Sequence, residues 1–359
     1  MPNVLSDDLE RVLDGTRELW EEVRGQRIFI TGATGFFGCW LLETLLWAND
    51  RLGLNARTTI LTRNPQAFQR KAPRLALHPA VTMLMGDVRT FPFPAGGFSH
   101  VIHAATQSSE TLNRQQPEVM FDTIVRGTRR CLEFAAAAGA RRFLLTSSGA
   151  VYGPQPPQVT HLAETFTGGP DPVDLNSAYA EGKRAAEMLC VLASRGSVLE
   201  TKIARCFTFV GPYMELDAHF AIGNFIRDQL NGGPIRVHGD GTPCRSYMYA
   251  SDLATWLWTI LCRGAAGRAY NAGSEETVTI RELAHAVADA LTPRMEVEIL
   301  GTPMPGAPVQ RYVPSTARAR QELGLTSQVS LRQAIQRTQA WFQRKGVAGM
   351  QEAAQGAAR

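Results

Sequence analysis

The stretch that most constrains the fold is Arg27 to Leu46, RIFITGATGFFGCWLLETLL. An apolar, β-prone run leads into Gly32, Gly35 and Gly38, and a helical pattern follows directly. This order provides a tight turn after a strand, a close backbone approach to a pyrophosphate, and close packing of helix on sheet. The helix N-terminus then points its free N–H groups at the phosphates. The stretch predicts dinucleotide binding rather than an ordinary glycine-rich turn.

The composition describes a soluble globular chain of 359 residues with 44% hydrophobic residues and a formal net charge of +4. The charge is small and is not concentrated in a tail, which argues against nucleic-acid binding. The six cysteines are scattered without a C-x-x-C pair, as in a cytoplasmic enzyme with reduced thiols. No apolar run reaches the roughly 18 to 20 residues of a membrane span, and the acidic start is not a signal peptide. We therefore expect a cytoplasmic protein with no membrane or nucleic-acid partner.

The identity of the dinucleotide depends on the end of the second strand, expected at 58–62. An NAD site has an acidic residue there that accepts hydrogen bonds from the adenine ribose. This chain has Arg63, and a guanidinium suits the 2′-phosphate of NADP(H). A solvated arginine beside a loop proline is the alternative interpretation, so NAD and NADP both remain open.

Two later strand ends also face the expected cofactor site. Asp87 follows the third strand (81–85) and is positioned to face the adenine, while small residues follow the fourth strand (100–103) and allow close backbone approach. His103 is expected to be structural, since no metal ligands lie at suitable spacing, and we expect no metal site. The expected cofactor-binding residues are Gly32, Thr34, Gly35, Phe36, Phe37, Gly38, Arg63, Asp87, Val88, Ala104, Ala105, Thr106, Tyr179 and Lys183.

The candidate catalytic residues are Ser148, Tyr179 and Lys183. Ser148 follows the fifth strand (142–146), and Tyr179 and Lys183 lie one turn apart on one face of a helix that begins near Asn176-Ser177. An ammonium close to a phenol favours the phenolate and lowers the tyrosine pKa toward a range usable for proton transfer. The serine hydroxyl completes the site by binding the reacting oxygen. An exposed helix face is the alternative for Y-x-x-x-K taken alone.

Together, T-G-x-x-G-x-x-G, a serine before V-Y-G and Y-x-x-x-K resemble the extended short-chain dehydrogenase/reductase family, specifically its nucleotide-sugar epimerase/dehydratase branch. The resemblance covers about residues 26 to 340. It implies that Tyr179 transfers the proton, that Lys183 is its electrostatic partner and bonds the nicotinamide ribose, and that Ser148 binds the sugar oxygen. It also implies a nucleotide-diphosphate sugar as substrate, and a homodimer formed through helices around 117–138 and 177–194.

The resemblance assigns four further residues to the substrate. Asn224 resembles an asparagine that contacts the diphosphate, and Val237 lies in a short strand (235–239) that resembles one lining the base pocket. Arg245 matches an arginine that grips the pyrophosphate, and Arg311 is a second phosphate ligand. A surface salt bridge is the alternative for each arginine. We expect Asp252 to cap the helix that follows it, and Trp256 and Trp258 to be core or interface residues.

The chain departs from the family that it resembles at Gly149 and Ala150. Dehydratases of the family have acidic residues at both positions, and decarboxylases have a glutamate at the second. The loss argues against both reactions unless Glu164 or Glu181 substitutes. Epimerases and 4-keto reductases need only the Ser-Tyr-Lys set and the cofactor. An NAD(P)-dependent epimerase acting at C4 is therefore favoured. The alternatives are an NADPH-dependent 4-keto-sugar reductase, a dehydratase or decarboxylase with non-standard acid–base residues, a reductase of steroid or phenolic ketones, and a non-catalytic dinucleotide sensor.

The expected fold is α/β, a Rossmann-type doubly wound parallel sheet with a smaller C-terminal α/β substrate lobe. Residues 1–24 are expected to form a helix over 6–24, capped by Ser6, on the outside of the first lobe. The Rossmann domain is expected at 25–207, with a return segment at about 244–263. The substrate lobe is expected at 208–243 and 264–345, and a tail at 346–359.

Overall fold

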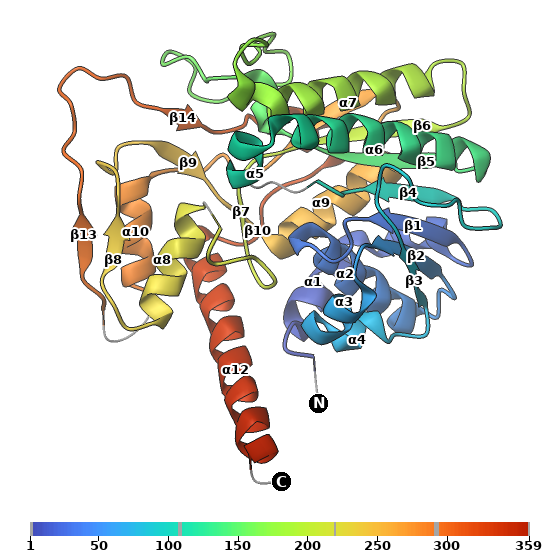
Figure 1. The fold of residues 1–359 in the computed structure, drawn as a ribbon, viewed down its shortest axis with the longest axis horizontal. Helices are drawn as coiled ribbons and strands as arrows, with labels where there is room; N and C mark the ends of the chain where they lie inside the picture. Colours follow the sequence, from blue (N-terminus) through green and yellow to red (C-terminus); the bar gives the residue numbers. More distant parts are fainter. Residues whose placement is uncertain (1–2, 107–109, 219, 291–293, 358–359) are drawn as a thin grey trace.

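The computed structural model describes residues 3–106, 110–218, 220–290 and 294–357. Within them, one central sheet has seven parallel strands in the order β11-β6-β5-β4-β1-β2-β3 (Figure 1). Their bounds are β1 Arg27–Thr31, β2 Arg57–Thr62, β3 Val81–Met85, β4 His100–His103, β5 Arg142–Ser148, β6 Glu200–Cys206 and β11 Arg268–Ala272. The strand order reverses between β1 and β4, and ligands of such sheets bind at the carboxyl ends beside this reversal. The Rossmann-type prediction is confirmed.

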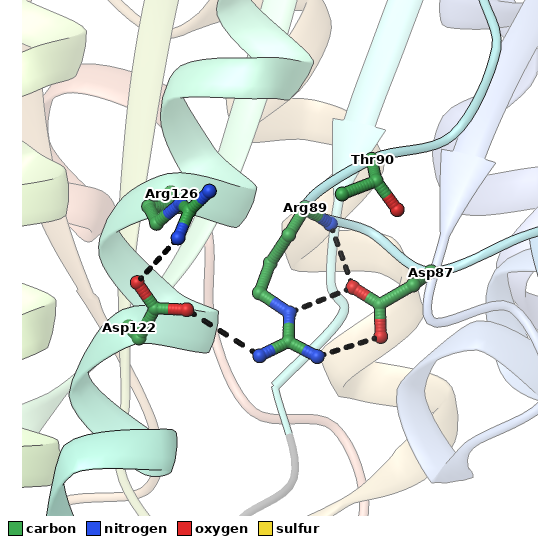
Figure 2. Close-up of a pocket in the computed structure, with 5 residues that line it drawn as sticks. All are labelled: Asp87, Arg89, Thr90, Asp122 and Arg126. Atoms are coloured by element: carbon green, nitrogen blue, oxygen red, sulfur yellow. Dashed lines mark hydrogen bonds and ion pairs between the residues drawn. The ribbon is translucent and has the colours of Figure 1, made fainter.

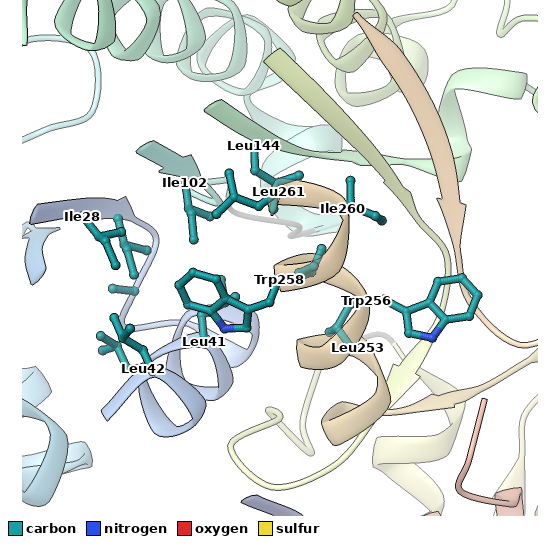
Figure 3. Close-up of a cluster of buried hydrophobic side chains, with 14 of the residues drawn as sticks. Ile28, Leu41, Leu42, Ile102, Leu144, Leu253, Trp256, Trp258, Ile260 and Leu261 are labelled. Carbon is teal, nitrogen blue, oxygen red and sulfur yellow. The ribbon is translucent and has the colours of Figure 1, made fainter. Parts of the chain in front are cut away.

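Helices cover both faces of this sheet. One face carries α2 (Phe36–Leu52) and α9 (Ala250–Arg263), where Ile28, Ile102 and Leu144 pack with leucines and tryptophans of the two helices (Figure 3). The opposite face carries α6 (Pro117–Ala137) and α7 (Ala178–Ser194). Neighbouring strand residues alternate between the two cores, because successive side chains of a strand point to opposite faces. Trp256 and Trp258 are fully buried, which confirms their predicted place in the core.

The N-terminal segment differs from the predicted single helix over 6–24. It forms α1 (Ser6–Thr16) and a separate 3₁₀ helix, η1 (Arg17–Val23). Ser6 is the first helical residue rather than the cap, and the N-cap position, Leu5, has no side-chain hydrogen bond. The helix breaks because Thr16 leaves helical geometry at φ −128°, and its hydroxyl accepts a hydrogen bond from the Trp20 indole at 3.0 Å.

The second lobe contains two small sheets beside a helical layer (Figure 1). Its elements are α8 Ala221–Leu230, β8 Ile235–Val237, β9 Cys244–Ser246, β12 Thr277–Thr279, α10 Ile280–Ala288, β13 Val297–Ile299 and β14 Arg311–Tyr312. Strand β9 lies between β12 and β14, and β8 pairs with β13. A short parallel pair, β7 (Phe209–Val210) and β10 (Met248–Tyr249), connects the lobes.

The chain returns to the first lobe in α9, which falls within the predicted return segment, and again in β11, which lies after it. Strand β9 begins the expected return segment of 244–263 but belongs to the second lobe, whereas β11 lies beyond that segment and forms the edge of the main sheet. After α11 (Ala317–Leu323), helix α12 runs from Leu331 to Ala357, so a single helix spans the expected boundary at 345 and most of the expected tail. The remaining elements are α3 Pro65–Lys71, α4 Pro73–Ala76, α5 Glu110–Gln115, η2 Gly149–Tyr152 and η3 Leu175–Ser177. None of the described helices is long and apolar enough to cross a membrane.

Candidate active site

Lys183 connects helix α7 to the ends of two strands. Its ammonium donates hydrogen bonds to the Thr106 hydroxyl (2.8 Å) after β4 and to the Thr146 carbonyl (2.7 Å) in β5. Its side chain is buried, and Tyr179, one turn earlier, is only partly exposed. Helix α7 begins at Ala178 behind η3, where the Asp174 carboxylate accepts the Asn176 N–H at 2.9 Å. The exposed-face alternative for Y-x-x-x-K is therefore excluded.

The pKa of Tyr179 differs from the sequence-based expectation. Burial raises it to about 12, and a hydrogen bond with Ser148 opposes this rise only in part. The Lys183 ammonium lies 5.9 Å from the centre of the tyrosine ring and directs its hydrogen bonds to threonine oxygens instead. Burial also lowers the pKa of Lys183 to about 8. Desolvation is thus the largest cause of the pKa shift of both groups, and the expected lowering of the phenol pKa is wrong.

Ser148 lies between two tyrosines at the end of β5. Its hydroxyl accepts the Ala150 N–H at 3.1 Å, which starts η2. Hydrogen bonding with Ser148 lowers the pKa of both Tyr179 and Tyr312 and so opposes the effect of their burial. The structure thus brings Ser148 and Tyr179 together from β5 and α7, as the sequence predicts, and adds a second phenol.

Tyr312 was not found by sequence reasoning. It lies in β14, opposite Arg245 of β9, and its ring packs on Phe207 with centroids 4.7 Å apart. A Cβ atom added to Gly149 would lie 2.6 Å from the Tyr312 hydroxyl. The phenol therefore fills the space above the position where the dehydratases of the family have an acidic residue. The only sequence signal for Tyr312 was its place next to Arg311. Strand β14 has two residues and forms by pairing with the distant β9, so its local sequence does not predict it.

The two glutamates considered as substitute acids are held elsewhere. Glu164 accepts the Asn271 N–H at 2.9 Å and lies 3.9 Å from the Arg318 guanidinium. Glu181 pairs with Arg184, three residues along α7. Among the described residues, neither glutamate forms a hydrogen bond or ion pair with the catalytic set. The suggested substitution for the missing acids is thus not supported by their positions.

The glycine-rich turn has the close contacts that a dinucleotide site needs. Gly32 has φ +72°, and a Cβ there would lie 2.3 Å from the Ala104 carbonyl oxygen in the turn after β4. A Cβ on Gly38 would lie 2.2 Å from the Cα of Ala33, so a side chain would separate α2 from the turn. Gly35 is the N-cap of α2, and a Cβ added there would have one neighbour within 4 Å, the Gly32 carbonyl oxygen at 3.4 Å. Since α2 begins there with free N–H groups, the residues present fit a pyrophosphate.

The other expected residues of the turn and of the β4 end lie around it. Phe36 and Phe37 form the first turn of α2, and the Phe37 ring contacts Phe209 near the start of the second lobe, 5.1 Å between centroids. Ala105 donates its N–H to the Thr31 hydroxyl at 3.3 Å. These contacts bring the ends of β1 and β4 together at the reversal of strand order.

Asp87 and Val88 make contacts within the protein. The Asp87 carboxylate accepts hydrogen bonds from the Arg89 backbone and guanidinium, and these lower its pKa (Figure 2). Arg89 also bonds to Asp122 of α6, which pairs with Arg126. The four charged residues line a cavity of about 190 Å³. Val88 is buried and packs against Gly127. A Cβ added to Gly127 would lie 3.0 Å from a methyl group of Val88.

The two predicted phosphate-binding arginines lie on adjacent strands of the second lobe. Arg245 of β9 and Arg311 of β14 are both half-buried. The Arg245 guanidinium donates to the neighbouring Cys244 carbonyl at 2.8 Å. Within the part of the chain that the structure describes, neither arginine pairs with a carboxylate, which excludes the surface salt-bridge alternative. Two cations are thus available there to an anionic ligand.

Asn224 and Val237 point into the protein in this conformation. Asn224 lies in the first turn of α8, where its amide nitrogen donates to the carbonyls of Leu216 and Ala218 at 2.9 and 3.0 Å. Val237 is buried among apolar residues of the second lobe and pairs with Ile299 of β13. Both stay predictions as substrate contacts.

Two further residues have structural contacts. Asp252 lies inside α9, and its carboxylate accepts the N–H groups of Gln328 and Val329 at 2.9 and 3.0 Å, so the prediction that it caps the following helix is wrong. His103 is buried between the hydroxyls of Thr31 (2.8 Å) and Thr128 (3.1 Å), and burial lowers its pKa to about 3. It remains neutral and structural, as the sequence predicts.

Comparison with known proteins agrees with this geometry. A family model described as the NAD dependent epimerase/dehydratase family matches residues 28–273. UDP-glucuronic acid decarboxylase 2 of Arabidopsis thaliana is 31% identical over 316 residues, 87% of this chain and 67% of its own length. UDP-glucuronic acid decarboxylase 6 of the same plant is also 31% identical, over 86% of each chain.

Solved structures give the same result. The dTDP-glucose 4,6-dehydratase DesIV of Streptomyces venezuelae, crystallised with NAD and TYD, is 26% identical with a TM-score of 0.73, over 89% of this chain and 97% of its own. A UDP-N-acetylglucosamine 4-epimerase of Methanobrevibacter ruminantium has a TM-score of 0.76 at 19% identity, over 89% of this chain and 99% of its own, and shows the common fold. The chain belongs to the NAD-dependent epimerase/dehydratase family of extended short-chain dehydrogenases/reductases.

Proposed function

We propose that this protein is an NAD(P)-dependent 4-epimerase of a nucleotide-diphosphate sugar. The observation that carries the proposal is the assembled set of Ser148, Tyr179 and Lys183 beside Gly149 and Ala150, which have no acid–base group. Transient oxidation at C4 needs only this set and the dinucleotide. Elimination of water and protonation after decarboxylation each need a further acid or base.

In the proposed reaction, Tyr179 accepts the proton of the C4 hydroxyl while the hydrogen on C4 leaves as hydride. A dinucleotide held at the glycine-rich turn would supply the hydride acceptor for this step and the hydride donor for the opposite face of the sugar. Ser148 binds the C4 oxygen, and the Lys183 charge stabilises the phenolate. Because burial raises the phenol pKa to about 12, the phenolate that accepts the proton depends on the Ser148 hydrogen bond, which lowers this pKa, and on the Lys183 charge. Tyr179 then gives the proton back to the inverted hydroxyl.

The substrate is held at its diphosphate by Arg245 and Arg311. Arg245 pairs with Tyr312 across β9 and β14, and its charge and a hydrogen bond with Ser148 both lower the Tyr312 pKa, so the Arg245 end of this grip lies near the Ser148 hydroxyl. Planar guanidinium groups bind phosphate oxygens in pairs, which fixes orientation as well as charge. The relatives named for UDP- and dTDP-sugars support this substrate class.

A 4-keto-sugar reductase is the second candidate. It would use the same catalytic set, but the dinucleotide would enter reduced and leave oxidised. A cavity lined by Arg63 and Lys71 at the adenosine end favours this candidate, because cellular reductions commonly draw on NADPH. Native mass spectrometry and absorbance of the purified protein separate the two. Retained dinucleotide supports the epimerase, and an empty site that takes up NADPH from solution supports the reductase.

We also propose that the enzyme is a homodimer formed through α6 and α7. Exposed apolar side chains gather on these two helices, at 39% exposure for Val119 and 60% for Met188. The others are Phe121, Val191 and Leu192. Exposed apolar groups on two adjacent helices are typical of a helical dimer interface. Light scattering at micromolar concentration should give a dimer mass, and Met188→Glu with Leu192→Glu should give a monomer. A monomeric wild-type mass contradicts the proposal.

A further inference from the structure

A cavity of about 200 Å³ lies between the glycine-rich turn and the end of β2. Its lining residues are Thr34, Thr62, Arg63, Asn64, Ala67, Phe68 and Lys71. Thr34 belongs to the turn after β1, Thr62 is the last residue of β2, and the others follow β2 or belong to α3. In a Rossmann fold this location is where the adenine ribose of the dinucleotide binds.

The cavity lacks the group that recognises an unphosphorylated ribose. A carboxylate at the end of β2 normally accepts hydrogen bonds from the ribose hydroxyls. Here β2 ends in Thr62, and none of the seven lining residues is acidic. The Thr62 hydroxyl is also engaged, because it accepts the Asn64 N–H at 3.2 Å. Asp87 lines the other cavity and is bonded to Arg89 (Figure 2), and the charge of Arg63 contributes to the lowering of its pKa.

Two cations take the place of that carboxylate. The Lys71 ammonium donates to the Thr34 carbonyl at 2.8 Å, which holds it over the turn and leaves its other two N–H groups available. Arg63 is exposed at the cavity, and among the described residues it forms no ion pair. The cavity is thus lined by two positive side chains and by no carboxylate, and Asp87, on which the Arg63 charge acts, lies outside its lining.

We propose that Arg63 and Lys71 form a binding site for the 2′-phosphate of NADP(H). A phosphate dianion at the ribose 2′ oxygen would meet the guanidinium fork on one side and the ammonium on the other. An NAD ribose would leave both cations unpaired and its own hydroxyls without an acceptor. The chain thus departs at this site from the NAD-dependent relatives of its family.

This inference rests only on the dinucleotide-binding part of the proposed function. The 2′-phosphate lies at the adenosine end, far along the cofactor from the nicotinamide, so the hydride chemistry at C4 is the same with either dinucleotide. An epimerase that retains NADP and a reductase that exchanges NADPH both agree with it.

The test is calorimetric binding of adenosine 2′,5′-bisphosphate and of 5′-AMP to the full-length protein, since this readout needs neither sugar nor turnover. A charge-assisted pair of contacts predicts that the bisphosphate binds about 10- to 100-fold more tightly. The same ratio is expected for NADP⁺ over NAD⁺. Its size should fall as salt is added, because exposed charges are screened.

Variants assign the preference to the two cations. Arg63→Ala and Lys71→Met should each remove most of the preference while 5′-AMP affinity stays within about twofold of wild type. Arg70→Ala is the matched control, because Arg70 is an exposed arginine of the same helix α3 that does not line the cavity. Equal binding of the two nucleotides by the wild type overturns the proposal. A preference that survives in both cavity variants, or that Arg70→Ala also removes, overturns it as well.

Discussion

The reacting end of the site and its phosphate-binding regions differ in how their charged groups are satisfied. At the reacting end, Lys183 is buried and hydrogen-bonded to two oxygens within the protein. In the proposed phosphate-binding regions, Arg63, Arg245 and Arg311 lie at least partly open to solvent without an ion pair among the described residues. We propose that the internally satisfied lysine serves the sugar chemistry, and that the unpaired arginines bind the anionic groups of this chain's own ligands.

Replacing the phenol should have the largest effect, and it acts only at the reacting end. Tyr179→Phe removes the group that accepts and returns the proton, so kcat should fall by about 10² to 10⁴. Dinucleotide affinity should change little, because the phosphate contacts lie elsewhere. Steady-state kinetics and cofactor titration measure the two quantities. A variant with near-wild-type kcat would remove Tyr179 from the chemistry.

Removing an unpaired arginine should instead weaken substrate binding. Arg245→Met retains much of the apolar stem but loses the charge, and KM for the nucleotide sugar should rise about 10- to 100-fold with a smaller change in kcat. Arg236→Met is the control, because Arg236 is an exposed arginine nearby that pairs with Glu298. Equal effects in the two variants would show that the pairing of an arginine does not predict its function.

The buried lysine predicts the pH dependence of the reacting end. Burial lowers the Lys183 pKa to about 8, so the ammonium loses its proton as pH rises through that value. Since its charge favours the phenolate, kcat/KM should decrease above pH 8 by up to about tenfold per pH unit. The pH profile of kcat/KM, which reports groups of the free enzyme, is the measurement. A profile that stays flat to pH 10 contradicts this role for Lys183.

A methyl group at Gly149 should have the smallest effect. Its Cβ would lie 2.6 Å from the Tyr312 hydroxyl and 2.7 Å from the Phe207 ring, so both side chains must move. Gly149→Ala should lower the free energy of unfolding by about 1 to 3 kcal/mol, the usual range for overpacking. Gly233→Ala is the control, because a Cβ there meets nothing within 4 Å. Thermal denaturation measures the stability of the two variants. If Gly149→Ala is as stable as Gly233→Ala, Tyr312 does not fill this space.

Most of the first lobe was predictable because its signals are local. The glycine spacing, the Y-x-x-x-K pair and the apolar strands each occupy a short stretch, and β3 and β4 have the predicted bounds. The place of β11 was missed, because a strand at the sheet edge depends on pairing with β6, more than sixty residues earlier in the chain.

The site was predictable in its residues but less so in its energetics. The sequence predicted that Lys183 lowers the Tyr179 pKa, yet burial raises it and only the Ser148 hydrogen bond opposes the rise, and burial is a property of the whole fold. Tyr312 and the Lys71 ammonium were missed for a related reason. Each reaches the site from another element, and its neighbours there are distant in the sequence.

The most direct test of the account is proton NMR of the enzyme incubated in D₂O with UDP-, dTDP-, CDP- and GDP-sugars. An epimerase returns the same hydrogen to C4, so we predict a C4-inverted product that retains protium at C4 and takes up no deuterium at C5. A product that has lost carbon dioxide or water, with deuterium at C5 or C6, would contradict the account, because it requires the acid–base step for which Gly149 and Ala150 supply no group.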